Sequence, residues 1–151
     1  MAGILAALTL YAVAMAYVEA MVVVYLRRML PFTRMAEGTV HEVKAILQAN
    51  HLYFEEQTRE AATIIMLAAV ALATGKGARE RWAAFLWCFA LWDICYYLFL
   101  RVWTGWPRSL AEWDVLFLIP VPWLAPVGLP VAIAAAMAVA ALLLFRGGDK
   151  G

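Results

Sequence analysis

The chain has 151 residues, of which 66% are apolar, and its mean hydropathy is +0.79. Soluble globular proteins are only about half apolar, so this composition indicates an integral membrane protein. The formal net charge is +1 and no Lys/Arg-rich block occurs, which excludes the basic surface of a nucleic-acid-binding protein.

Segments long enough to cross a bilayer as helices occupy residues 3–26, 53–74, 82–103 and 123–145. A backbone that faces lipid must satisfy its hydrogen bonds within a helix. We therefore predict an all-α fold, an integral membrane four-helix bundle with up-down connectivity, in a single domain over residues 1–151. The first segment has no positively charged leader and is too long for a signal-peptide core, so we expect it to be retained. A multi-pass protein of a prokaryotic cytoplasmic membrane is the expected setting.

Two segments that connect the predicted spans are themselves expected to form short helices. An apolar stripe over residues 40–47 predicts a short interfacial helix before the second span. Ser109 followed by Glu112 matches a capping box, which predicts a second short helix from Leu110 that ends before Pro120. The prolines that follow predict a broken start to the last span. We expect the segment from residue 104 to residue 122 to cap one end of the bundle.

Small residues recur at every fourth position of the last span, at Ala132, Ala136 and Ala140. Such a stripe lets another helix approach closely. It is compatible with packing inside the bundle and with a homo-oligomer.

Acidic residues lie below the expected membrane surface in three spans. Glu19 precedes Arg27 by eight residues, and Asp93 precedes Arg101 by the same number. The apolar run 61–74 is too short to cross a bilayer alone, so its helix must begin earlier and carry Glu60 inside. Up-down connectivity then places Glu19, Glu60 and Asp93 at one depth from the same membrane face.

Other polar residues are expected near this layer. Glu56 lies one helical turn before Glu60, Tyr97 lies one turn after Asp93, and Glu55 with Arg59 has the spacing of a helix-surface ion pair. His51 is four residues before Glu55, and Asp114 lies in the capping segment. The candidate metal ligands are Glu19, His51, Glu56, Glu60, Asp93 and Asp114, with Glu55, Arg59 and Tyr97 in support.

A charged carboxylate at the centre of a membrane helix costs about 2.5–3.5 kcal/mol, and acids in spans usually face the bundle interior. Unpaired carboxylates must become protonated or bind cations. The leading interpretation is a divalent metal site with iron, manganese or zinc, in a membrane oxidoreductase that acts on a hydrophobic small molecule.

Other interpretations stay open. One alternative is a proton- or cation-coupled transporter or channel. A second is an accessory or assembly subunit whose polar layer only fixes the register of its helices. The sequence contains no Walker loop, serine elbow or dinucleotide fingerprint, so those enzyme classes have no support.

Overall fold

The computed structural model describes residues 2–30 and 40–147, and this part of the chain is mostly helical with a small antiparallel sheet. The elements in chain order are α1 (Ala2–Met29), α2 (Val40–Ala49), α3 (Tyr53–Thr74), α4 (Ala78–Thr104), β1 (Trp113–Phe117), β2 (Trp123–Pro126) and α5 (Gly128–Arg146).

Three helices are long and apolar enough to cross a membrane, which fits a membrane protein. They are α1, α4 and α5, over Gly3–Met29, Ala78–Thr104 and Gly128–Arg146. Helix α3 coincides with the second predicted span, 53–74, but it is not in this set. Its first two turns carry four charged side chains, Glu55, Glu56, Arg59 and Glu60.

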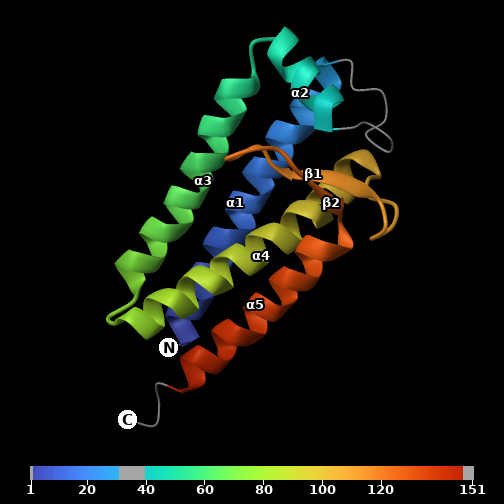
Figure 1. The fold of residues 1–151 in the computed structure, drawn as a ribbon. Helices are drawn as coiled ribbons and strands as arrows, with labels where there is room; N and C mark the ends of the chain where they lie inside the picture. Colours follow the sequence, from blue (N-terminus) through green and yellow to red (C-terminus); the bar gives the residue numbers. More distant parts are fainter. Residues whose placement is uncertain (1, 31–39, 148–151) are drawn as a thin grey trace.

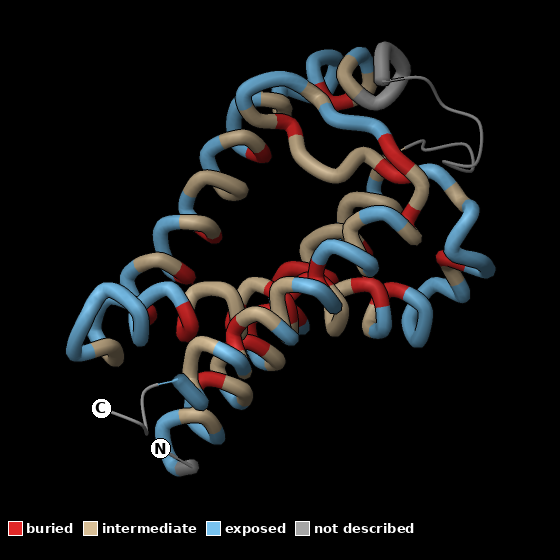
Figure 2. Tube along the Cα trace, turned by 60° about the horizontal axis from the view of Figure 1, so that its bottom comes forward, coloured by how far each residue is buried: buried red, intermediate tan, exposed pale blue. Residues whose placement is uncertain are grey.

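Helix α4 is the centre of the arrangement and packs against α1, α3 and α5. The start of α1, the α3–α4 turn and the end of α5 lie at one end of the molecule, while α2 and the β-hairpin lie at the other (Figure 1). Helices α3 and α4 meet at that turn and diverge toward the hairpin (Figures 1 and 2). The hairpin lies where they are farthest apart, so it closes the wide end of the bundle.

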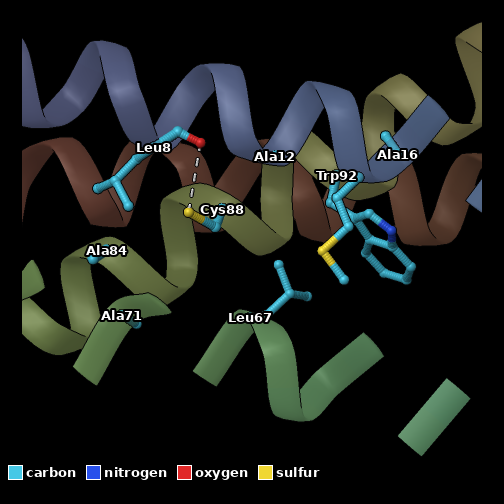
Figure 3. Close-up of a cluster of buried hydrophobic side chains, with 9 residues drawn as sticks. Leu8, Ala12, Ala16, Leu67, Ala71, Ala84, Cys88 and Trp92 are labelled. Carbon is cyan, nitrogen blue, oxygen red and sulfur yellow. Dashed lines mark hydrogen bonds between the residues drawn. The ribbon is translucent and has the colours of Figure 1, made fainter. Parts of the chain in front are cut away.

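An apolar core joins α1, α3 and α4, with Leu8 from α1, Leu67 from α3 and Cys88 from α4 among its side chains (Figure 3). Alanines at the contact points, including Ala12, Ala71 and Ala84, allow the helix backbones to approach closely. Leu67 from α3 is fully buried in this cluster. Buried positions follow the inward sides of the helices, and exposed positions follow the outward sides (Figure 2).

The predicted short helix from Leu110 is wrong, because this segment forms a turn and a β-hairpin. Strands β1 and β2 pair antiparallel, with Asp114 opposite Ala125 and an irregularity between Val115 and Phe117. Glu112 does not open a helix: its side chain accepts the backbone N–H of Arg108 at 3.1 Å and so closes a turn. The run from Trp113 to Phe117 is rich in aromatic and β-branched residues, which favour a strand once partner elements are present.

The last span begins later than predicted. Residues 123–126 pair with β1, so the helix starts at Gly128 and not at residue 123. The backbone N–H of Gly128 donates to the carbonyl of Leu110 at 2.7 Å, which fixes this start against the preceding turn. Pro130 then lies in the first helical turn, where a missing N–H is tolerated.

The alanine stripe of the last span does not face α4. Ala134 and Ala141 are the buried residues of α5, whereas Ala132 and Ala136 are exposed on the single chain.

Helix α2 lies at the end of the bundle that carries the hairpin. Its Leu47 is buried with Leu118 of the β1–β2 connection, and Val115 of β1 packs against this pair. The contact holds α2 beside the hairpin.

Candidate functional site

A cavity lies between α1, α3, α4 and the hairpin, with a volume of about 120 Å³. Ionisable side chains from four elements line it: the carboxylates are Glu19, Glu56, Glu60, Asp93 and Asp114, and the guanidinium groups are Arg27 and Arg59. Five carboxylates therefore share the cavity with two fixed positive charges. A void this size has room for several water molecules or a small ligand group.

Arg59 of α3 pairs with one carboxylate of α1 and with one carboxylate of its own helix. Its guanidinium forms ion pairs with Glu19 and with Glu56, the latter through Nε and Nη2 at 2.9 and 2.8 Å. The hydroxyl of Thr63 donates to the second oxygen of Glu19. Both oxygens of Glu19 are thus occupied, and one guanidinium serves two buried acids.

The hairpin is fastened to α3 at Leu118, directly after β1. The backbone N–H of Leu118 donates to Oε2 of Glu60 at 2.8 Å, and its carbonyl accepts from Nε2 of Gln57 at 3.1 Å. Glu60 therefore lines the cavity and also fixes its roof.

A second fastening joins the hairpin to α4. The hydroxyl of Tyr97 donates to Oδ2 of Asp114 at 3.1 Å. Burial raises the pKa of Asp114 to about 6, while Arg27, Tyr97 and the backbone N–H of Val115 act in the opposite direction. Arg27 itself stacks on Trp106, with Cζ 4.2 Å from the ring centroid.

The raised pKa of Asp114 makes stability depend on pH. The folded protein holds this proton up to about pH 6, whereas an unfolded Asp releases it near its ordinary pKa of 3.8. The free energy of unfolding therefore falls as pH rises between these values. The expected loss is about 3 kcal/mol, which is absent below the unfolded pKa and complete above the folded one. Unfolding temperatures in a non-ionic detergent should be higher at pH 5 than at pH 7.5.

Asp114→Asn should make stability depend less on pH than in wild type, because an amide is neutral throughout and still accepts from Tyr97. Glu55→Gln, at an exposed acid, should keep the wild-type profile. Equal pH dependence in wild type and Asp114→Asn would contradict this assignment.

Asp93 differs from the other acids of the cavity. It is only 8% exposed, and its Oδ2 atom has no hydrogen-bond partner among the described residues. Nε1 of Trp92, beside it on α4 and also in the cavity lining, is likewise buried without a partner there. A buried polar atom left unpaired costs about 1–3 kcal/mol, so these two atoms mark this part of the cavity as a candidate ligand site.

Two predicted site residues lie away from the cavity. His51 is exposed in the turn between α2 and α3, with a left-handed φ of 58°, and α3 begins only at Tyr53. The spacing from His51 to Glu55 is therefore not helical, and Glu55 is itself exposed. The predicted surface pair of Glu55 with Arg59 is wrong, because Arg59 turns inward to the buried Glu19 and Glu56.

A metal-ligand cluster is not found in the described part of the chain. No three His, Cys, Asp or Glu side chains of residues 2–30 and 40–147 come together closely enough to hold a metal ion. The acids that share the cavity are held apart by Arg59, by the Leu118 backbone and by Tyr97, each of which occupies carboxylate oxygens.

Sequence reasoning missed several residues of the site. Thr63 lines the cavity and binds Glu19, Gln57 donates to the carbonyl of Leu118 in the roof, and Trp92 and Tyr96 line the cavity beside Asp93. A signal for α3 was present: Glu56, Arg59, Glu60 and Thr63 recur at the spacing of one helical face.

Comparison of the chain with protein-family models, with curated proteins and with solved structures finds no match.

Proposed function

We propose that this chain is a multi-pass membrane protein whose cavity binds a cation that arrives from one membrane face. Helices α1, α4 and α5 supply three spans by length and composition. We take α3 as the fourth, because its apolar half packs in the core through Leu67 and Ala71. Its charged half then faces the cavity and not lipid, which lowers the cost of carrying charges at that depth.

The unpartnered Oδ2 of Asp93 is the observation that carries this proposal. Five carboxylates face two guanidinium groups, so up to three negative charges lack a fixed partner. Glu19 and Glu56 share Arg59, and Asp114 has Tyr97 and the field of Arg27. Asp93 has a fully buried carboxylate oxygen without a partner among the described residues, and a cation compensates a buried carboxylate best.

A divalent metal is the less favoured occupant. Iron, manganese and zinc need several protein donors that converge on one point. The described residues bring no such group of donors together, so we propose neither a redox metal nor an oxidoreductase activity for this cavity.

Binding from one side is favoured over transport through the molecule. The cluster that includes Leu8, Leu67 and Cys88 fills the bundle between the cavity and the opposite end. Its buried side chains are apolar, and they offer an ion no chain of polar groups to follow.

The test is thermal stabilisation of purified protein in a non-ionic detergent by a panel of cations at constant ionic strength. The panel contains chlorides of three classes of cation: the alkali ions sodium and potassium, the divalent metals manganese and zinc, and the organic cation tetramethylammonium. We expect at least one cation to raise the unfolding temperature of wild type and of the exposed-site control Glu55→Gln, because a ligand that binds only the folded state stabilises it. Asp93→Asn should lose this shift while it retains its helical circular dichroism. If every cation acts equally on wild type and Asp93→Asn, the proposal is wrong.

A further inference from the structure

The wall of the cavity next to Asp93 is aromatic. Trp92, Tyr96 and Phe117 all line it. The Trp92 ring is stacked on Tyr96 with centroids 6.4 Å apart, and it lies tilted against Phe117 with centroids 6.5 Å apart. These rings come from α4 and from β1, so they form one continuous apolar surface across two elements.

The sequence of α4 explains why this surface adjoins the carboxylate. Trp92 and Tyr96 are four residues apart and share one stripe of the helix, and Asp93 with Tyr97 forms the adjacent stripe. Tyr97 holds Asp114, so the free carboxylate oxygen of Asp93 lies beside ring faces, and the unpaired Nε1 of Trp92 is the other buried polar atom of α4 without a partner among the described residues.

An inorganic cation fits these surroundings poorly. Sodium, potassium and divalent ions require several oxygen ligands that converge on one point to replace their hydration shell. No three acidic, His or Cys side chains of the described residues converge in this way, and the free oxygen of Asp93 lies next to aromatic rings. An alkylated ammonium group has a diffuse charge and carries apolar substituents. Aromatic faces attract such cations and pack against their methyl groups.

The size of the cavity agrees with a small group of this kind. Its volume of about 120 Å³ is somewhat below that of cavities known to hold one benzene ring. Val23, Leu26 and Pro130 add further apolar surface to the lining. A trimethylated or tetramethylated ammonium group would fill this space. If the group belongs to a larger molecule, the rest of that molecule would lie outside the cavity.

We infer that the cation bound by this protein is an alkylated ammonium group, whose charge Asp93 pairs and whose alkyl substituents pack on Trp92, Tyr96 and Phe117. This inference rests on the proposed function and narrows it. The ammonium group belongs either to a small amine in solution or to the headgroup of a membrane lipid, because both present the same chemistry to the site.

Tetramethylammonium and a choline lipid are the probes that test the inference. The first arm titrates tetramethylammonium chloride against sodium chloride in non-ionic detergent and follows unfolding temperature. The second compares nanodiscs of phosphatidylglycerol with nanodiscs that also contain phosphatidylcholine. Wild type should be stabilised by tetramethylammonium beyond the sodium control. A further shift from phosphatidylcholine would support a lipid source, and its absence would support a soluble amine.

Variants separate the carboxylate from the aromatic wall. Asp93→Asn should weaken the apparent Kd for tetramethylammonium at least tenfold. Phe117→Leu keeps an apolar side chain of comparable reach in the half-buried strand and should weaken it about tenfold. The exposed-site control Glu55→Gln should leave it unchanged.

The cation panel separates a failure of the ammonium inference from a failure of the proposed cation site. If sodium, potassium or a divalent metal stabilises the protein in an Asp93-dependent way while tetramethylammonium and phosphatidylcholine do not, the ammonium inference is overturned and the proposed function stands. If no cation of any class acts through Asp93, both are overturned.

Discussion

Arg59→Gln is expected to destabilise the folded protein by about 3–5 kcal/mol, the usual cost of removing one partner from a buried ion pair. Arg59 is the shared partner of Glu19 on α1 and Glu56 on α3. Without it, two carboxylates face each other inside the bundle with no opposite charge between them. Denaturant unfolding in detergent micelles, followed by circular dichroism, measures the change.

A double variant and a control show whether the ion pair is the cause. Glu19→Gln combined with Arg59→Gln removes a charge of each sign, so most of the lost stability should return. Arg28→Gln changes an exposed arginine near the same end of α1 and should shift stability by less than about 0.5 kcal/mol. If Arg59→Gln is as stable as wild type, Arg59 does not hold α1 and α3 together.

Leu67→Ala should also cost about 2–5 kcal/mol, because it leaves a void in a packed core. Leu67 is fully buried between α1 and α4, at the apolar half of α3. The same unfolding assay measures the effect.

Leu72→Ala is the matched control on the same helix. Leu72 is 57% exposed, so its truncation creates no internal cavity and should cost less than about 1 kcal/mol. Equal effects at the two positions would show that α3 does not pack with the face described above.

The helices could be predicted from the sequence because they depend on local signals. The second predicted span, 53–74, has the bounds of α3, and the first and third predicted spans lie within α1 and α4. Length, apolar runs and flanking charges fix such segments. Depth counting along three helices also predicted that Glu19, Glu60 and Asp93 would meet, and all three line the cavity.

The hairpin could not be predicted in this way. Its position depends on hydrogen bonds between Leu118 and α3 across about sixty residues of sequence. Ser109 and Glu112 have the spacing of a helix cap, but Glu112 binds the backbone of Arg108 inside a turn. Local spacing alone does not distinguish these two uses of the same side chain.

The partner of Arg59 was mispredicted for a related reason. Helical spacing allows both Glu55 and Glu56 to pair with it, and only the buried Glu19 on α1 decides the direction of the guanidinium. The position of His51 could not be predicted either. His51 itself has a left-handed backbone conformation before the start of α3, and no glycine in the sequence indicates this conformation.

Equilibrium dialysis of radiolabelled tetramethylammonium against purified protein in non-ionic detergent tests the central claim most directly, since it counts bound cations per chain. We expect saturable binding of one cation per chain in wild type and in Glu55→Gln, and none above background in folded Asp93→Asn. Equal binding by wild type and Asp93→Asn, or no saturable binding by either, would contradict the claim that the free carboxylate of Asp93 pairs an alkylated ammonium group.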